Sequence, residues 1–134
     1  MTHPLVQRLF DEYGYPEVSL ETHGDFVGQP GVAVLFFAGD PRRFRDTTDI
    51  AVVLPELVKA LGGELRAGVV TPEAGKPLQE HYRFETWPAL VFLRDGACLG
   101  SICGIQNWSD YLEQIDRMLR AGPTQPERVP AINL

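Results

Sequence analysis

The sequence predicts an α/β fold in which a central sheet is covered by helices on both faces. Residues 31–38 are apolar without a break, which is typical of a strand that is buried on both faces and is therefore central in its sheet. A second apolar run, residues 89–93, leads to Asp95-Gly96, a dipeptide that favours a tight hairpin turn, so two antiparallel strands should meet there. Segments with helical spacing of apolar residues supply the covering layers.

The composition is that of one globular domain. The chain has 134 residues, of which 44% are hydrophobic and 22% are charged. A chain of this length buries roughly two thirds of its unfolded surface, which is enough for a core. We expect a single domain over residues 1–121 and a proline-containing tail over 122–134 that is mobile or ordered only against a neighbour.

The sequence has no segment typical of membrane insertion or export. Its apolar runs are all well short of the roughly 20 residues of a membrane span. The first residues lack the basic region and the long apolar region of a signal peptide. We therefore expect a cytoplasmic protein with reduced thiols.

The net charge of −6 is concentrated near the start of the chain. Residues 1–30 hold five carboxylates against one base, Arg8, so this segment alone carries −4. The carboxylates are those of Asp11, Glu12, Glu17, Glu21 and Asp25. This charge disfavours a nucleic-acid-binding surface and allows a basic peptide partner, or it serves only to keep a small protein soluble.

The first elements are predicted from apolar spacing and turn residues. Residues 4–13 should form a helix that Gly14 stops. Its apolar face carries Leu5, Val6, Leu9 and Phe10. Residues 17–20 are expected to pair as an outer strand, and residues 21–30 read as a turn-like loop.

The second half of the chain alternates between helix and strand patterns. We expect a helix over 50–61, a strand over 64–70 and a helix over 76–84. A last helix is predicted over 108–119, because its apolar residues share one face, and Asn107 or Ser109 can cap it.

This order of elements resembles thioredoxin over residues 17–121. Pro55 matches the proline that kinks the helix after the thioredoxin active site, Pro88 matches its cis-proline, and Gly104 matches the glycine beside its peptide groove. The resemblance implies a thioredoxin-like α/β fold, with a central mixed sheet of four to five strands flanked by helices on both faces. It also implies a cis Trp87–Pro88 bond, which an aromatic-proline step at the mouth of a strand allows.

The chain departs from thioredoxin where the enzyme carries its chemistry. Leu35 stands where the enzyme has a buried aspartate, and the redox Cys-x-x-Cys falls on residues 47–50, which contain no cysteine. Disulfide exchange requires a thiolate, which neither a hydroxyl nor a carboxylate can replace. We therefore expect no disulfide reductase activity, and only a helix cap from Thr47, Thr48 or Asp49.

The cysteines and histidines suggest neither a disulfide nor a metal site. Cys98 and Cys103 are five positions apart, so on a regular strand their side chains point to opposite faces, and we expect ordinary buried thiols. His3, His23 and His81 are widely separated, and no pair of ligands has zinc-like spacing.

Other catalytic constellations are also missing from the sequence. It contains no glycine-rich phosphate loop, no Gly-x-Ser-x-Gly elbow and no His-Glu-x-x-His motif. Single groups such as Asp40, Asp49 and Glu85 lack an evident partner group, so a structural role is the preferred interpretation. We assign no catalytic residue, no metal ligand and no cofactor.

The resemblance narrows to one group of thioredoxin-like proteins. The motifs are Asp-Pro-Arg-Arg at 40–43, Pro-Glu-Leu at 55–57, Phe84 ahead of the 87–92 segment, and Gly104-Ile105 followed by Trp108. A chain with these motifs in this order resembles the hydrogenase accessory proteins HyaE and HupG. That family implies a cytoplasmic maturation factor for the small subunit of an uptake NiFe hydrogenase, which recognises the twin-arginine signal peptide of the small-subunit precursor before export.

A peptide-binding site follows from the same resemblance. A thioredoxin-type groove holds an extended peptide by backbone hydrogen bonds, which needs no catalysis. Tryptophan rings offer apolar surface to a signal peptide, and carboxylates can take its arginines through charge-assisted bonds. The predicted peptide-binding residues are Asp40, Asp46, Asp49, Glu85, Trp87, Pro88, Gly104 and Trp108. Core packing of the last helix is the alternative for Trp108.

Arg42 and Arg43 resemble an export motif only superficially. They lie mid-chain with no apolar region after them, so they cannot serve as an N-terminal signal. Either they belong to a solvated loop, or they contact acidic or backbone groups of a partner.

Three functions stay open. The first is a dedicated chaperone for the hydrogenase small-subunit precursor, with other hydrogenase maturation proteins as further partners. The second is a thiol oxidoreductase that uses Cys98 or Cys103, and the third is a scaffold within a maturation complex that never touches the signal peptide. Nucleic acid is not expected as a partner.

Overall fold

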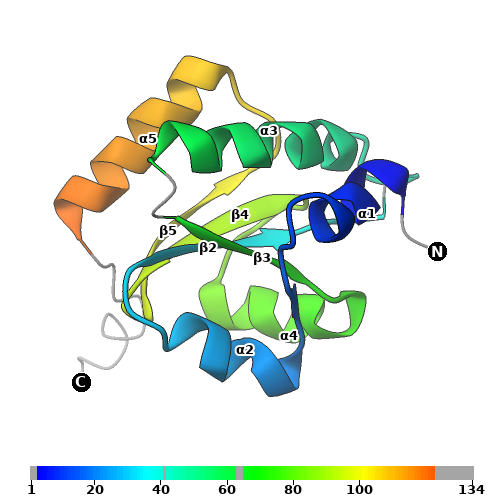
Figure 1. Ribbon diagram of the computed structural model, residues 1–134, viewed down its shortest axis with the longest axis horizontal. Coiled ribbons are helices and arrows are strands. Elements are labelled where there is room, and N and C mark those ends of the chain that lie inside the picture. The colour runs from blue at the N-terminus through cyan, green and yellow to red at the C-terminus, as the bar shows by residue number, and fades with distance from the viewer. Residues whose placement is uncertain (1–2, 41, 63–64, 123–134) are drawn as a thin grey trace.

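The computed structural model describes residues 3–40, 42–62 and 65–122 (Figure 1). Its centre is a mixed sheet of five strands in the order β1-β3-β2-β4-β5, in which β1, β3 and β2 run parallel and β4 is antiparallel to β2 and β5. The strands are β1 (Glu17–Val18), β2 (Val32–Phe37), β3 (Arg66–Val70), β4 (Ala89–Arg94) and β5 (Ala97–Cys103). The predicted central strand is confirmed, because β2 lies between β3 and β4.

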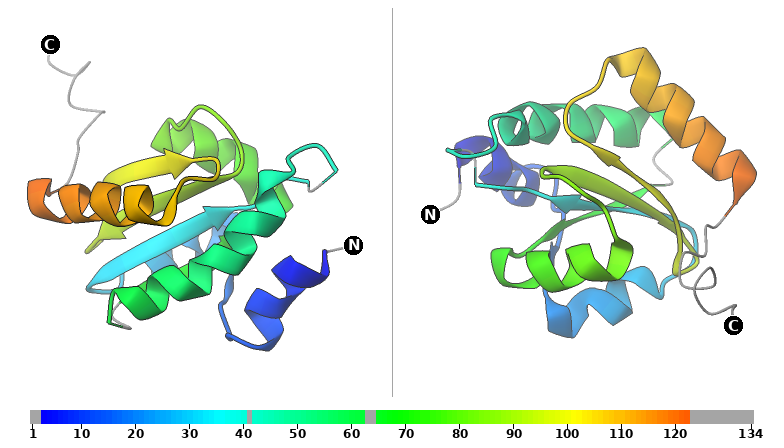
Figure 2. Two further views of the ribbon diagram at one scale, coloured as in Figure 1. Left: turned by 90° about the horizontal axis from the view of Figure 1, so that it is seen from above. Right: turned by 180° about the vertical axis from the view of Figure 1, so that it is seen from behind.

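Helices cover both faces of the sheet, as the α/β prediction requires (Figures 1 and 2). One face carries α1 (Pro4–Asp11), α3 (Asp46–Ala60) and α5 (Trp108–Ala121). The other face carries α2 (Leu20–Val27) and α4 (Pro72–Tyr82). The strands alternate with the helices until β4, which leads directly into β5.

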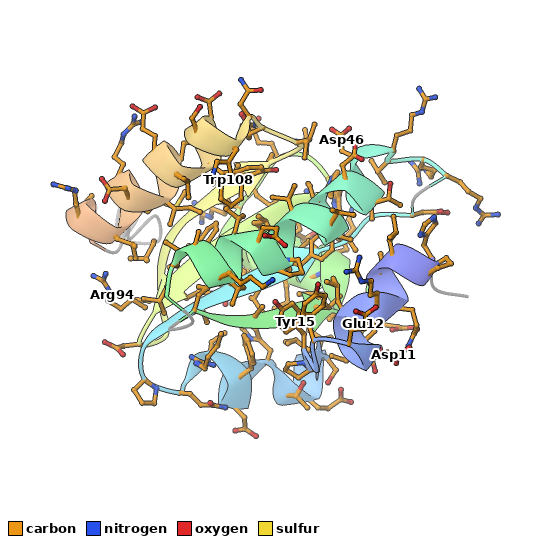
Figure 3. All side chains as sticks on the ribbon, turned by 45° about the horizontal axis from the view of Figure 1, so that its top comes forward. Asp11, Glu12, Tyr15, Asp46, Arg94 and Trp108 are labelled. Carbon is orange, nitrogen blue, oxygen red and sulfur yellow. The ribbon has the colours of Figure 1, made fainter. Side chains whose placement is uncertain are left out.

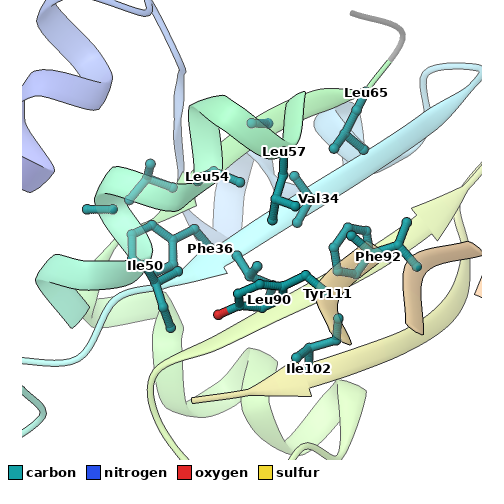
Figure 4. Packing of buried hydrophobic residues seen from close by; sticks show 14 of the residues in the cluster. Val34, Phe36, Ile50, Leu54, Leu57, Leu65, Leu90, Phe92, Ile102 and Tyr111 are labelled. Atoms are coloured by element: carbon teal, nitrogen blue, oxygen red, sulfur yellow. The ribbon is translucent and has the colours of Figure 1, made fainter. Parts of the chain in front are cut away.

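Two apolar cores follow from the alternation of side chains along β2. Val34 and Phe36 belong to the core beneath α1, α3 and α5 (Figure 4), whereas Leu35 and Phe37 belong to the core beneath α2 and α4. All four side chains are fully buried. The unbroken apolar run therefore reflects two buried faces rather than one.

The first two elements agree with the sequence. α1 buries Val6 and Leu9 of its predicted apolar face, and Gly14 follows it with a φ of 68°. β1 pairs with β3 at the edge of the sheet, as expected for an outer strand, although it ends at Val18.

The predicted hairpin at Asp95-Gly96 joins β4 to β5 and is confirmed. Asp95 and Gly96 have φ angles of 52° and 87°, the positive values that this two-residue turn needs. The Asp95 carboxylate accepts a hydrogen bond from the Gly31 amide at 2.7 Å, which ties the turn to the start of β2.

The prediction of a loop over residues 21–30 is wrong, because α2 occupies most of this segment. Ser19 and Thr22 form a capping box: the Ser19 hydroxyl accepts from the Thr22 amide at 3.2 Å, and the Thr22 hydroxyl accepts from the Ser19 amide at 2.9 Å. Phe26 is buried over Gly68, where an added Cβ atom would come within 2.9 Å of the Phe26 ring. Capping and burial outweigh the turn-forming residues.

α3 begins four residues earlier than expected, at Asp46. Thr47, Thr48 and Asp49 therefore lie inside its first turn, and no side chain caps the helix, so the predicted cap is wrong. The Thr48 hydroxyl donates instead to the Arg45 carbonyl at 3.4 Å.

α4 starts earlier than predicted, whereas α5 starts at Trp108 as predicted but lacks the predicted side-chain cap. α4 begins at Pro72 rather than at residue 76, because the Thr71 hydroxyl caps it by accepting from the Ala74 amide at 3.3 Å. At α5, Asn107 occupies the N-cap position, but its side chain donates to the Asp110 carboxylate at 3.4 Å and does not cap the helix.

The prediction that Cys98 and Cys103 point to opposite faces is wrong. A bulge at Leu99 shifts the register of β5 against β4, so both cysteines pack against the core beneath α2 and α4. They pair across the sheet with Leu93 and Ala89, which are four positions apart, or about 13 Å of strand. That separation is too long for a disulfide, and both side chains are half-buried rather than fully buried.

No helix in the described ranges is long and apolar enough to cross a membrane. Gly122 follows the last turn of α5, and residues 123–134 lie outside the described part of the chain. The division into a domain over 1–121 and a tail over 122–134 therefore stays a prediction.

Candidate functional site

Three segments that are far apart in the sequence meet at one end of the sheet: the start of α3, the residue before β4, and the turn from β5 to α5. The Gly104 amide donates to the Pro88 carbonyl at 2.8 Å, and the Ile105 amide donates to the Asp46 carboxylate at 3.4 Å. The Trp87–Pro88 peptide bond at this point is cis. Three residues predicted for the peptide site, Asp46, Pro88 and Gly104, are therefore neighbours. We call these three residues the site cluster.

Gly104 is held in a conformation that suits glycine. Its φ is 73°, and an added Cβ atom would lie 3.7 Å from the Asp46 carboxylate, so the backbone rather than crowding is the constraint. The Tyr111 hydroxyl donates to the Gly104 carbonyl at 3.1 Å. Burial raises the pKa of Tyr111, and the nearby Asp46 and Asp49 carboxylates raise it further. Tyr111 is one of the apolar residues predicted to share one face of the last helix, and its hydroxyl among aliphatic positions is the signal for this second role.

An exposed apolar surface adjoins the site cluster. Trp108, the first residue of α5, is 43% exposed, and Ile105 is 38% exposed. Neither side chain belongs to an apolar core, so core packing of Trp108 is wrong. Figure 3 shows Trp108 near the start of α5 and Asp46 at the start of α3.

Trp87, predicted to offer apolar surface to a peptide, is largely engaged within the fold. Its ring lies edge-on to Phe37 and Phe84, with centroids 5.8 and 5.6 Å apart. An added Cβ atom on Gly75 would come within 2.5 Å of the same ring. The indole N–H donates to the Gln79 side chain at 2.9 Å, so its polar group is already used.

Asp40 is exposed in the loop before α3 and is paired within that loop. Its carboxylate lies 3.2 Å from the Arg42 guanidinium, and the hydrogen bond from Arg42 lowers the pKa of the Asp40 carboxyl. The Arg43 guanidinium lies over the Phe44 ring, 5.3 Å from its centroid. Both arginines are exposed, in agreement with the solvated-loop interpretation.

Asp49 and Glu85 complete the predicted set but do not belong to the site cluster. Asp49 is exposed in the first turn of α3, close enough to Tyr111 to affect its pKa. Glu85 is exposed between α4 and β4, and its carbonyl accepts from the Gln79 side chain at 3.4 Å. Within the described ranges, neither carboxylate forms a hydrogen bond to the site cluster.

The positions equivalent to the thioredoxin redox residues are buried and lack thiols. Thr47 is 0% exposed, and Ile50 and Leu35 are equally buried. The Thr47 hydroxyl has no hydrogen-bond partner among the residues that the structure describes. The start of α3 therefore carries hydroxyl, carboxylate and aliphatic groups, none of which exchanges disulfides.

Two histidines that are distant in the sequence meet on the other face of the sheet. The rings of His23 of α2 and His81 of α4 have centroids 6.0 Å apart, and His23 Nε2 hydrogen-bonds to the Tyr82 hydroxyl at 2.5 Å. Burial, followed by the proximity of His81, lowers the pKa of His23. Over the described residues, no three histidine, cysteine or acidic side chains are placed to hold a metal ion.

Comparison with known proteins places this chain in a family. The family described as Hydrogenase-1 expression protein HyaE matches residues 5–111. The chain belongs to the HyaE family. Among its relatives, the hydrogenase expression/formation protein HoxO of Azotobacter vinelandii is 39% identical over 133 residues, covering 99% of this HyaE-family chain and 89% of HoxO. The predicted resemblance to HyaE and HupG is therefore confirmed.

Solved structures agree on the fold of this HyaE-family chain. A structure described as hydrogenase expression/formation protein HupG of Rhodopseudomonas palustris is 40% identical, has a TM-score of 0.57, and covers 79% of this chain and 96% of its own. Thioredoxin of Plasmodium falciparum is 14% identical, has a TM-score of 0.63, and covers 76% of this chain and 97% of its own. The fold is therefore thioredoxin-like, as predicted.

Proposed function

We propose that this HyaE-family chain is a non-catalytic chaperone of hydrogenase maturation. It binds, in the cytoplasm, the twin-arginine signal peptide of the small-subunit precursor of an uptake NiFe hydrogenase before export. Its family and its relatives, which are named as hydrogenase expression or formation proteins, support the hydrogenase as the client. Other hydrogenase maturation proteins are further partners in this role.

The observation that carries the proposal is the meeting of exposed apolar side chains with a half-exposed and an exposed carboxylate at the site cluster. Ile105 and Trp108 offer apolar surface, while Asp46 and Asp49 offer carboxylates at the start of α3. Signal peptides join a basic region to an apolar region, and this surface complements both. The resemblance to thioredoxin adds support, because a fold of that kind can hold an extended peptide by backbone hydrogen bonds beside the proline that opens this strand.

Typical interaction energies indicate how much the ionic and the apolar contacts each contribute to peptide binding. A charge-assisted bond contributes about 1.5 to 3 kcal/mol, but an exposed ion pair often contributes less than about 1 kcal/mol. Burial of a large apolar side chain contributes about 1.5 to 3 kcal/mol. Apolar contact therefore supplies most of the affinity, and the carboxylates supply the preference for arginine.

Several features support a role without thiol chemistry. The buried residues Thr47, Ile50 and Leu35 stand where the redox and acid groups of thioredoxin would be. Cys98 and Cys103 lie on β5 and face the core beneath α2 and α4 rather than the start of α3. The oxidoreductase alternative requires insulin reduction that is lost in Cys98→Ser or Cys103→Ser, whereas the proposal predicts no turnover.

Calorimetric titration of the signal peptide tests the proposed surface. A variant with Asp46→Asn and Asp49→Asn should bind about three- to ten-fold more weakly, and twin-glutamine peptide should lose the same increment, because both remove the ionic contact. A matched variant with Glu21→Gln and Asp25→Asn, exposed carboxylates of α2, should bind as the wild type does. Unchanged affinity in the first variant, without salt dependence, would move the site elsewhere, towards Asp11 and Glu12.

A further inference from the structure

A separate cleft of about 710 Å³ opens at the ends of β2 and β3, next to α1. These two strands are parallel neighbours, but β2 leads to α3 on one face of the sheet and β3 leads to α4 on the other. Loops that diverge to opposite faces leave a crevice at the carboxyl ends of the strands. Figure 1 shows α1 beside this end of the sheet. Pro88 and Gly104 lie on the other side of β2, towards β4 and β5.

The walls of the cleft are mainly apolar. They include Pro4, Val6, Phe10, Ala38, Val69 and Pro72, which come from α1, the end of β2, the end of β3 and the start of α4. The volume falls within the range of about 300 to 1,000 Å³ that encloses a ligand of many atoms, so it can hold several side chains of a peptide. The N-terminal helix α1 thus builds one wall of a hollow that the sheet alone would leave open.

The polar groups that line the cleft are mostly engaged by the chain itself. His3 Nδ1 accepts from the Leu5 amide at 3.1 Å, the Thr71 hydroxyl accepts from the Ala74 amide, and Asp40 is paired with Arg42. A site for a small polar ligand needs free polar groups that converge on it. This cleft offers apolar surface instead.

One carboxylate at the rim of the cleft favours a positively charged ligand. Glu17 lines the cleft and is exposed at the edge strand β1, and no hydrogen bond or ion pair engages its carboxylate within the described ranges. The Asp40–Arg42 pair at the same rim adds no net charge. The cleft therefore combines an apolar floor with a net negative rim, which complements a segment that is apolar and basic.

We propose that this cleft takes apolar side chains of an extended polypeptide segment that carries a positive charge beside them. The identity of the partner, the precursor's signal peptide, rests on the proposed function, because that peptide joins a basic region to an apolar one. The cleft then gives the chaperone a second contact, on the β3 side of β2. Bound there, the apolar region is shielded from water before export.

Filling the cleft tests the proposal most simply. The probe is a synthetic peptide with a central run of leucines flanked by arginines, titrated calorimetrically against the full chain. Ala38→Phe should weaken binding about ten-fold or more, because it occupies the space of one buried apolar side chain. Val52→Phe, at an exposed position of α3 outside the cleft, should bind as the wild type does. Thermal unfolding checks that both variants are folded.

The rim charge gives a second test that does not disturb packing. Glu17→Lys should weaken binding of the arginine-flanked peptide about three- to five-fold, because it replaces attraction by repulsion at the rim. It should strengthen binding of a glutamate-flanked peptide for the same reason. Glu21→Lys makes the same charge change at an exposed position of α2 that does not line the cleft, and should have a smaller effect. No binding by the wild type, equal binding by the two phenylalanine variants, or equal effects of the two lysine variants would overturn the proposal.

The natural signal peptide, titrated in parallel, separates this inference from the proposed function. If the wild type binds it and Ala38→Phe binds it equally well, the cleft is not the contact and the proposed function stands. If the wild type binds the leucine-arginine peptide through the cleft but does not bind the signal peptide, the proposed function fails and the chemistry assigned to the cleft stands.

Discussion

Among single residues of the site, Gly104 has the most constrained backbone. Its φ of 73° is costly for other residues, while its amide and carbonyl bond to Pro88 and Tyr111. Gly104→Ala should therefore reduce the free energy of unfolding by about 1 to 2 kcal/mol, measured by urea denaturation. Gly24→Ala, in α2 with open space around it, should instead stabilise the protein by about 0.5 to 1 kcal/mol. Equal destabilisation by both changes would refute the conformational argument.

At Thr47 we expect a substitution to stabilise the protein. Its hydroxyl is buried without a hydrogen-bond partner among the described residues, a situation that costs about 1 to 3 kcal/mol. Thr47→Val keeps the shape and removes the unpaired group, so the free energy of unfolding should rise, by up to about 1 kcal/mol, in urea denaturation. Thr48→Val, which removes a hydroxyl bonded to the Arg45 carbonyl, should not stabilise. A loss of stability in Thr47→Val would show that the hydroxyl is bonded.

Among the secondary-structure elements, α2 and α4 are joined by the hydrogen bond between His23 and Tyr82. Burial and His81 lower the pKa of His23, so the folded state binds its proton less readily than the unfolded state does, in which the pKa is about 6.5. The contribution of neutral His23 to the free energy of unfolding is therefore fully present above about pH 7. It is lost as the pH falls below the unfolded pKa towards the lower folded pKa.

Urea denaturation at about pH 7.5 and about pH 5 measures this effect. The wild type should lose more free energy of unfolding between the two conditions than His23→Gln, which cannot take up the proton. His81→Gln provides the comparison, because it should raise the pKa of His23 and so reduce the loss only partly. Identical pH dependence in all three proteins would exclude His23 as the source.

At the same scale, local physics explains which elements the sequence could predict. The central strand β2 and the Asp95-Gly96 hairpin follow from an unbroken apolar run and a turn dipeptide, which act within a few residues. α2 was only partly predictable in this way: its capping by Ser19 and Thr22 is local, but the packing of Phe26 over Gly68 of a distant strand is not. The bulge at Leu99 does have a local signal, the neighbouring Gly100 with its φ of 149°, because an isolated glycine inside a strand often marks a bulge.

For the molecule as a whole, the motifs predicted the thioredoxin-like fold and the HyaE family, and the order of short motifs was sufficient for both. The site was predictable only in part. Asp46, Pro88 and Gly104 meet as neighbours, but Trp87 is tied to Gln79, and Asp40 is tied to Arg42. These differences arise from side-chain partners that the spacing of residues along the chain does not reveal.

The cleft beside α1 was missed for a related reason. It forms where loops after β2 and β3 diverge and where an additional N-terminal helix adds a wall, so its lining comes from four separate segments. Each segment contributes ordinary apolar residues. Only the folded arrangement turns them into one surface.

The proposed function requires that this chain binds the signal peptide of a hydrogenase small-subunit precursor. Its most direct test is capture of the purified precursor by the immobilised full chain, with and without the signal peptide, at low and high salt. We expect strong capture of the intact precursor, weaker capture in high salt, and little capture once the signal peptide is removed. Equal capture of both forms would contradict it.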